Sequence, residues 1–449
     1  MKTRAFVLVA SIIGILSAFV IVVMAPVPRA VALAADQSAA SSPGRGKIVI
    51  MMVWDGLRPD SVTTRDTPNL SEMAHQGTRF DRHHSMYPTL TMVNAAALAT
   101  GAAPGQNEIV GNTMYYAPAL EDKGAVLGAG PLKDKIDKPI SNENSAMIAA
   151  LNSDNAFAGH LLGLDTIAQQ VERDGGYLAV AGKPGPAFFF DNRVESVKDG
   201  RDALGDPHRD YLFATDDLTM PEGASGDLKL PPASNDGVAD SARDEYSTRI
   251  VTDRAIANAK LASDGGHPAL IVLWQHNPDL TQHIAGLGTL PAIEALSNTD
   301  LNLAKIRAAI VSAGIADRTD IIVVSDHGFA TIRMTIDLNA LLTTAGLKKA
   351  LDSDDVVVAR NGGSDLIYLS KKEFPTDDAR RDKLQKIVNF AQAQEWCGPI
   401  FSRNLAPIVT EGRHRRRAPE KPYLGWIDGT FAAESIGILN SARSPDLTL

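Results

Sequence analysis

Cysteine is almost missing from this chain of 449 residues, which carries it only at Cys397. A single cysteine cannot close an intrachain disulfide, and it cannot supply a metal site that needs several thiolates. We therefore expect neither a disulfide-stapled fold nor a thiolate-rich metal centre. Cys397 itself is expected to be a small buried residue.

A surplus of basic residues is missing as well. The chain has 44 Lys and Arg residues against 53 Asp and Glu residues, and its formal net charge is −9. Because proteins that bind polyanions present a basic surface, we expect no nucleic-acid polymer as a partner. The one basic run, RHRRR at 413–417, is interpreted as a solvated loop, with contact to an anionic substrate as the alternative.

Residues 1–35 have the pattern of an export signal. Lys2 and Arg4 precede an apolar core of about 21 residues, and small residues at A-x-A spacing predict cleavage near Ala35. We expect an exported, periplasmic protein. The alternative is an uncleaved membrane anchor, because the core is long enough to span a bilayer. No cysteine lies there to carry a lipid, and a small-residue linker follows at 36–46.

Several short apolar runs are rich in Val and Ile, as in strands that are buried on both faces. They begin at residues 47 (KIVIMMVW), 176 (GYLAVAG), 268 (PALIVLWQ) and 319 (TDIIVV). Helical patterns separate them, which predicts an α/β fold with a doubly wound, mostly parallel sheet flanked by helices over residues 47–449. The stretch 191–241 is rich in Asp, Gly and Pro and predicts a loop-rich insertion near the substrate entrance.

Acidic and histidine residues follow three of these runs. Asp55 follows the first, Asp279 and His283 form a D-x-x-x-H pair after the third, and Asp326 and His327 follow the fourth. In doubly wound sheets, sites assemble beyond the carboxyl ends of the strands. Oxygen and imidazole ligands without thiolates favour Zn²⁺ over Mn²⁺ or Mg²⁺. These ligands are too many for one tetrahedral ion, so we expect two divalent cations.

Two threonines precede the alanine-rich run NAAALATG, which is expected to be a helix. A threonine hydroxyl becomes a nucleophile when a base or a metal removes its proton. At a helix start, Thr91 would face a phosphate group beside free backbone N–H groups. The alternative for these threonines is capping of the helix, which fits Thr89 or Asn94 equally well.

Taken together, these motifs resemble the nucleotide pyrophosphatase/phosphodiesterase family of the alkaline phosphatase superfamily. The resemblance extends over about residues 47–446 and rests on VWDGLRPD, YPTLTMVNAAALATG, IVGNTMYY, PDLTQH and SDHGF in this order. It implies an alkaline-phosphatase-like fold. It also implies metal-dependent hydrolysis of a phosphodiester or pyrophosphate bond in a small-molecule phosphodiester or nucleotide substrate.

The resemblance also implies roles for single residues. Thr91 would be the nucleophile that forms a phospho-threonine intermediate, and Asn112 would donate a side-chain N–H to a phosphate oxygen. The metal ligands would be carboxylates, imidazoles and the nucleophile itself. These are Asp55, Thr91, Asp326 and His327 for one metal, and Asp279 and His283 for the other.

The chain departs from the family pattern at two points. Met92 follows the nucleophile where the family has an aromatic residue, so a substrate base would rest on Met92. The family's further metal-binding histidine, in an H-G motif, has no counterpart after GTFAAESIGILNSARSPDL, and His414 is the only histidine after His327. We expect a truncated C-terminal end and a second metal site without its third ligand.

The sequence is also compared with three alternatives to a phosphodiesterase, of which the first two stay open. A phosphomonoesterase of the same superfamily shares the metal core. A catalytically impaired protein that binds phosphate or metal would fit the missing histidine. A sulfatase is disfavoured, because the sequence around Cys397, EWCGPI, does not match a sulfatase nucleophile.

Overall fold

The computed structural model describes residues 46–122, 138–152, 156–157, 159–191, 211–216, 219–220, 225–232, 241–404, 425–439 and 441–449. Arg45–Leu449 form one compact unit. The predicted signal at 1–35, the basic run at 413–417 and most of the predicted insertion at 191–241 lie outside the described residues. Among the residues described, no helix is long and apolar enough to cross a membrane.

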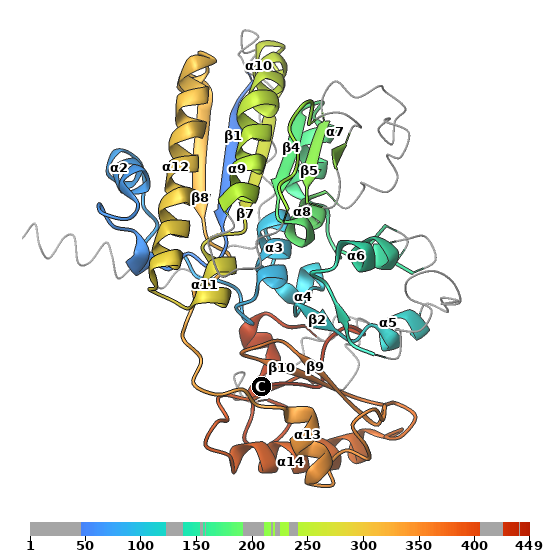
Figure 1. Cartoon of the computed structure of the whole chain (residues 1–449). Coiled ribbons are helices and arrows are strands. Elements are labelled where there is room, and N and C mark those ends of the chain that lie inside the picture. The colour runs from blue at the N-terminus through green and yellow to red at the C-terminus, as the bar shows by residue number, and fades with distance from the viewer. Residues whose placement is uncertain are drawn as a thin grey trace, which may run out of the picture. The chain divides into compact units, whose positions relative to one another are not determined.

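A six-stranded sheet forms the centre of this unit, in the order β6-β5-β4-β7-β1-β8 (Figure 1). All neighbouring strands pair in parallel except β5 and β6. The predicted mostly parallel α/β sheet is thus confirmed. Its strands are β1 (Ile48–Trp54), β4 (Tyr177–Gly182), β5 (Tyr211–Thr215), β6 (Thr219–Met220), β7 (Ala269–Gln275) and β8 (Thr319–Val324).

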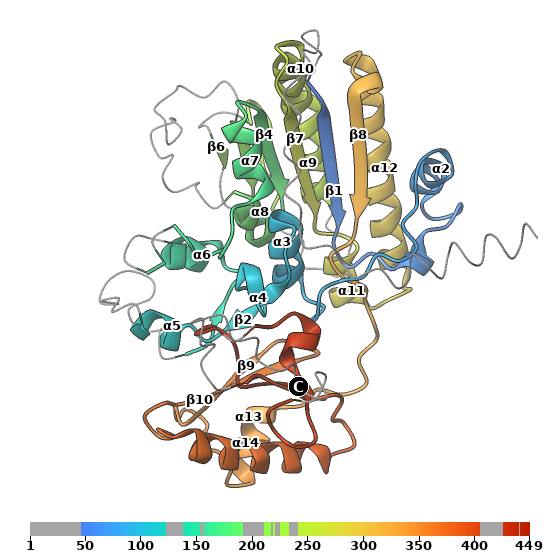
Figure 2. The same ribbon diagram turned by 180° about the vertical axis from the view of Figure 1, so that it is seen from behind.

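Helices cover both faces of this sheet, and Figures 1 and 2 show the two faces in turn. Alternate strand residues pack to opposite sides: Val53 joins the core under one helix layer, and Trp54 joins the core under the other. Both faces of β4 and β7 are therefore buried, which explains their continuous apolar runs. The expectation is wrong for β8, which is an edge strand and is partly exposed, with Ile322 43% exposed. One layer contains α3 (Thr91–Thr100), α7 (Ile167–Arg173) and α8 (Pro184–Phe190). The other contains α9 (Ser241–Ile250), α10 (Ile256–Asp264) and α12 (Leu290–Ser312).

Short elements complete the main part of the unit. A π-helical segment, Val251–Ala255, joins α9 to α10, and 3-10 turns lie at Pro59–Ser61 and Ala316–Arg318. The remaining helices and strands are α2 (Pro68–Gln76), α4 (Pro104–Asn107), α5 (Ala117–Asp122), α6 (Ser145–Asn152), α11 (Asp279–Ala285), β2 (Thr113–Met114) and β3 (Ile140–Ser141).

A second sheet, which the sequence did not reveal, is built by the C-terminal part. It has five strands in the order β12-β11-β13-β10-β9 and packs with two helices around a core of its own. Cys397 is only half-buried at the border of this core, rather than fully buried as expected. The elements are β9 (Val356–Arg360), β10 (Asp365–Leu369), β11 (Phe401–Ser402), β12 (Phe431–Ala432), β13 (Leu447–Thr448), α13 (Leu338–Thr344), α14 (Asp377–Gln392) and the 3-10 turn Ala433–Ile436.

One asparagine connects the second sheet to the strand β2. The side chain of Asn361 accepts the N–H of Thr113 at 2.8 Å and donates to the carbonyl of Thr113 at 3.0 Å. This paired bond fixes the chain next to Asn112.

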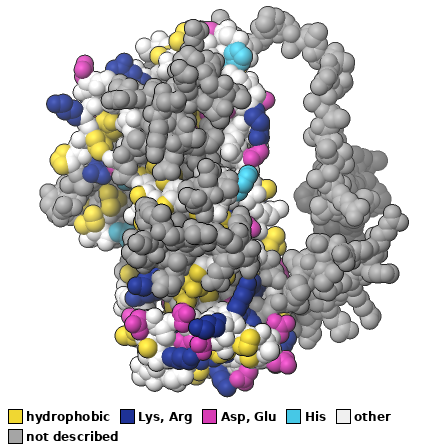
Figure 3. All heavy atoms as spheres, turned by 90° about the vertical axis from the view of Figure 1, so that its right-hand side faces the viewer, with side chains coloured by type: hydrophobic (Ala, Val, Ile, Leu, Met, Phe, Trp, Pro, Cys, Tyr) yellow, Lys and Arg dark blue, Asp and Glu magenta, His cyan; other side chains and the backbone are white. Residues whose placement is uncertain are grey.

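On the face shown in Figure 3, Lys and Arg side chains lie among Asp and Glu side chains in the lower part, so no field of a single sign forms there.

Candidate active site

The carboxyl ends of β1, β7 and β8 meet at one edge of the main sheet. Trp54 is opposite Gln275, and Val53 is opposite Val324, so the residues that follow these strands are neighbours. Backbone bonds confirm this closeness: the N–H of Asp279 donates to the carbonyl of Asp55 at 2.9 Å. The three segments that follow these strands, which carry Asp55, Asp279 and Asp326, therefore meet at one site.

Gly56 makes this meeting sterically possible. Its φ is +69°, and an added Cβ would lie 2.9 Å from the Cβ of Asp279. A left-handed φ and a close neighbour both select glycine. The N–H of Gly56 also donates to Asp326 Oδ1 at 3.1 Å, which orients that carboxylate. The glycine of the VWDG motif thus shapes the site through its backbone.

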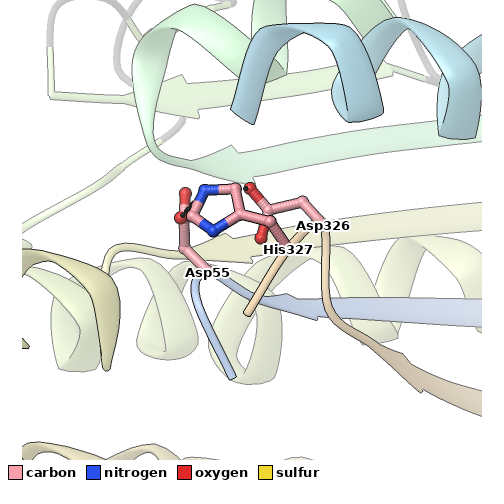
Figure 4. A group of neighbouring side chains, drawn as sticks. All are labelled: Asp55, Asp326 and His327. Carbon is pink, nitrogen blue, oxygen red and sulfur yellow. Dashed lines mark ion pairs between the residues drawn. The ribbon is translucent and has the colours of Figure 1, made fainter. Parts of the chain in front are cut away.

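Asp55, Asp326 and His327 form a compact group (Figure 4). The ring nitrogen Nε2 of His327 lies 3.5 Å from Asp55 Oδ1 and 3.3 Å from Asp326 Oδ2. Both carboxylates are buried, and these same two oxygens have no hydrogen-bond partner, which is also true of Asp279 Oδ1. Buried carboxylate oxygens without partners are costly unless a cation or donor satisfies them. The residues therefore fit a divalent cation at this point.

The tautomer of His327 suits a metal ligand. Its Nδ1 lies 2.7 Å from the carbonyl oxygen of Gly328, and because a carbonyl only accepts, Nδ1 carries the proton. In the neutral ring, Nε2 then presents its lone pair to the two carboxylates. Burial raises the pKa of Asp326, and the nearby charge of Asp55 raises it further. Such a shift is expected where like charges gather without a cation between them.

Thr91 lies beside this group at the first position of α3. Its Oγ1 is 3.1 Å from His327 Nε2, and the residue is only 3% exposed. Capping does not explain the threonines, because Leu90 is the residue at the cap position and no side chain caps the helix. Asn94 instead accepts the N–H of Met86 at 2.7 Å and donates to the carbonyl of Leu90 at 3.0 Å.

Asn112 is fixed by the backbone of the same helix. Its Oδ1 accepts the N–H of Met92 at 2.9 Å, and its Nδ2 donates to Glu143 Oε1 at 3.2 Å. The Met92 side chain is 0% exposed and belongs to the apolar core, so it offers no surface to a substrate base. Met92 contributes only its backbone N–H to the site. Its side chain is therefore not among the substrate contacts that we propose.

Asp279 and His283 form a pair rather than a complete metal site. Both belong to α11, and His283 Nε2 lies 3.3 Å from Asp279 Oδ1. The His283 side chain is 67% exposed and meets the ring of Phe329 edge-on. Across the described part of the chain, only Asp55, Asp326 and His327 gather as a group of three candidate ligands.

Lys183 is a charged site residue that the sequence analysis missed. Its Nζ lies 2.8 Å from Asp55 Oδ2, which also accepts the indole N–H of Trp274 at 2.8 Å. Burial opposes the charge of Lys183, but Asp55 and Asp279 outweigh it and raise its pKa. The signal was present in the sequence, since Lys183 directly follows a predicted strand at the same sheet edge.

A buried histidine holds the segment that leads to Asp279. The backbone N–H of His276 donates to Asp244 Oδ1 at 2.7 Å, and the N–H of Asn277 donates to Asp244 Oδ2 at 3.1 Å. The ring contacts Asp244 at 3.0 Å and Asp216 at 3.2 Å. Burial lowers the pKa of His276, but hydrogen bonds to Asp216 and Asp244 outweigh it and raise the pKa to about 9.

A cavity of about 620 Å³ lies beside these residues. Glu143, which bonds to Asn112, lines it, and so does Pro184, the neighbour of Lys183. Cavities of this size accommodate small organic ligands. The remaining lining residues are Asn144, Ser145, Ala146, Asp216 and Arg243.

The structure thus defines an α/β protein with a doubly wound sheet and with a candidate cation site and a threonine at its carboxyl edge. The model of the type I phosphodiesterase/nucleotide pyrophosphatase family matches residues 49–393, and the chain belongs to this family. This is the family that the motifs resembled. It comprises metal-dependent hydrolases.

Two solved structures are reported for comparison. An inactive variant of murine ectonucleotide pyrophosphatase/phosphodiesterase 5, in complex with AMP, is 16% identical over 90% of this chain and 78% of that chain, with a TM-score of 0.48. The human protein of the same name is 15% identical over 89% of this chain and 77% of that chain, with a TM-score of 0.48. No curated protein sequence matches the chain.

Proposed function

We propose that the protein hydrolyses phosphodiester or pyrophosphate bonds, with Thr91 as the nucleophile. The observation that carries this proposal is the 3.1 Å distance between Thr91 Oγ1 and His327 Nε2. It places a buried hydroxyl at the point where two unpartnered carboxylate oxygens, on Asp55 and Asp326, converge. A divalent cation at this point would be held by Asp55, Asp326, His327 and Thr91 itself.

The donor set of two carboxylates, an imidazole and a hydroxyl favours Zn²⁺. When bound, the cation lowers the pKa of the Thr91 hydroxyl and offsets negative charge on the phosphoryl oxygens. After its proton has passed to solvent, Thr91 Oγ would attack phosphorus in line. The bond to the leaving oxygen would break, and that oxygen would take up a proton from water. A phospho-threonine forms, and water cleaves it to regenerate the threonine and release the phosphorylated product.

Asn112 supports this step through its amide. Its Oδ1 is engaged by the backbone N–H of Met92, so Nδ2 is directed toward the side of Glu143. In the substrate complex, that N–H would donate to a non-bridging phosphate oxygen. Donors that are already oriented toward developing charge contribute strongly to catalysis.

We propose a small nucleotide or related phosphodiester as the substrate. The family is described by its nucleotide pyrophosphatase activity, and the cavity of about 620 Å³ beside Asn112 offers room for the group on the far side of the phosphate. An impaired binding protein is the second candidate, because Asp279 and His283 form only a pair.

Hydrolysis of bis(p-nitrophenyl) phosphate in the presence of Zn²⁺ tests the proposal. We expect faster turnover of this diester than of p-nitrophenyl phosphate. Thr91→Ala should lower the rate by at least about 10³-fold, because it removes the attacking group. Thr91→Ser retains a hydroxyl and serves as the matched control. Equal rates for the wild type and Thr91→Ala would refute Thr91 as the nucleophile, and binding of phosphate without turnover would favour the second candidate.

A further inference from the structure

The two oxygens of Asp55 face different partners. Oδ1 points to the group with Asp326 and His327, where a cation fits. Oδ2 is 2.8 Å from the ammonium of Lys183, which in turn is 3.7 Å from Asp279 Oδ2. A positive charge therefore already lies between Asp55 and Asp279.

We propose that the ammonium of Lys183 takes the place of a second cation, so that the site holds one divalent ion and one lysine. The inference rests on the proposed function for the first ion. It replaces the two-cation site expected from the sequence.

The ligand set at Asp279 supports this replacement. A catalytic zinc ion normally has three protein ligands and one open position. Within the described ranges, no third carboxylate or imidazole completes a compact group of three ligands with Asp279 and His283. Asp55 Oδ2 is already engaged by Lys183 and by the indole N–H of Trp274.

The backbone holds Lys183 firmly in this position. Its N–H donates to the carbonyl of Trp274 at 3.0 Å, directly after the tight contact between Gly182 and the same carbonyl. Its side chain is 21% exposed, so the stem is packed and only part of it reaches solvent. A divalent cation between Asp55 Oδ2 and Asp279 would meet a like charge at close range.

Zinc stoichiometry tests the proposal without relying on catalysis. The full chain is equilibrated with buffered ZnCl₂, passed through a desalting column and analysed for bound zinc by mass spectrometry. We expect one ion per chain for the wild type. Lys183→Met should bind two, because Asp55 Oδ2 and Asp279 become available, and its second ion should bind at least tenfold more tightly than any second ion on the wild type.

Three variants complete the design. Lys183→Arg keeps the charge and should bind one ion, and Lys305→Met removes an exposed lysine and should also bind one. If Lys183→Met fails to fold, Asp279→Asn still tests the proposal. This variant should bind one zinc ion per chain, as the wild type does. Two ions on the wild type, one ion on folded Lys183→Met, or a fall from two to one in Asp279→Asn would each overturn the proposal. A protein with this stoichiometry but without diester hydrolysis would instead refute the proposed function alone.

Discussion

Single residues at the site carry more than one contact each. Asp244, for example, accepts the backbone N–H groups of His276 and Asn277 and also contacts the imidazole of His276. That imidazole reaches Asp216 on its other side. A histidine with a carboxylate on each ring nitrogen is stabilised in its charged form. The segment that leads to Asp279 is thus anchored by a buried ionic cluster.

We predict that His276 makes stability depend on pH. Its pKa is raised from the usual 6.5 to about 9, so its contribution is complete below pH 6.5 and is lost as the pH rises through 9. The free energy of unfolding should fall by about 3 kcal/mol over this range, and His276→Asn should lack this fall. Urea unfolding at pH 6, 7.5 and 9.5 measures it.

The matched control for this experiment is His75→Asn, which changes an exposed histidine on α2. Its unfolding free energy should follow the wild-type curve. If the His276→Asn curve also runs parallel to the wild type across the whole range, the buried cluster does not hold a charged imidazole.

The order of the parallel strands allows a prediction of which residues gather at one edge of the sheet. Asp55, Asp279 and Asp326 were expected together because parallel strands end at a common edge, and the structure places them so. Lys183 escaped notice because a lone lysine after a strand is usually solvated. The orientation of Met92 could not be predicted either, since the core side of α3 is set by packing against α8 rather than by any local pattern.

At the scale of elements, the junction of β4 and α8 has the tightest geometry near the site. Gly182 has φ +113°, and an added Cβ would lie 1.8 Å from the carbonyl oxygen of Trp274. The chain can turn toward Lys183 only because this position has no side chain. This close approach therefore fixes both the end of β4 and the start of α8.

Replacing this glycine should strongly destabilise the fold. We predict that Gly182→Ala lowers the free energy of unfolding by about 3 kcal/mol or more, because the methyl group clashes with β7 and forces the backbone apart. Gly314→Ala is the matched control: it has φ +68° with open space around it, so it should cost only about 1 kcal/mol. Chemical denaturation of both variants measures the difference, and equal losses would show that the close approach to Trp274 is unimportant.

The whole molecule contains a second sheet that the sequence did not indicate. Its strands β9 and β10 have five mostly apolar residues each, but β11, β12 and β13 have only two residues each, so no apolar run marks these three strands. Most of the strand pairs are antiparallel. The main sheet was predictable because its central strands are buried on both faces and form continuous apolar runs. The short strands were not, because their pairing depends on partners far away in the chain.

We predict that zinc stabilises the whole fold more strongly at high pH than at low pH. In the metal-free protein, burial and Asp55 raise the pKa of Asp326, so stability falls as the pH rises above the ordinary carboxyl range. Zinc must displace these protons, and its advantage grows as they leave. The difference in melting temperature between zinc and EDTA should therefore increase from pH 5.5 to 7.5.

Asp326→Asn provides the comparison for the zinc experiment. It removes the titrating carboxylate, so the effect of zinc should be small and should vary less with pH. If zinc raised the wild-type melting temperature equally at both pH values, protons and the cation would not compete for this group.

The bond between Gly56 and Asp326 joins residues 270 positions apart. A chain that emerges from its N-terminus therefore carries the first aspartate long before the partners that complete the group exist. Because contacts this distant in sequence are slow to form, a cation that needs both residues would not bind before β1 and β8 have paired. Cation uptake would therefore report the pairing of β1 with β8, and it would not report the second sheet, whose strands all follow the candidate ligands in the chain.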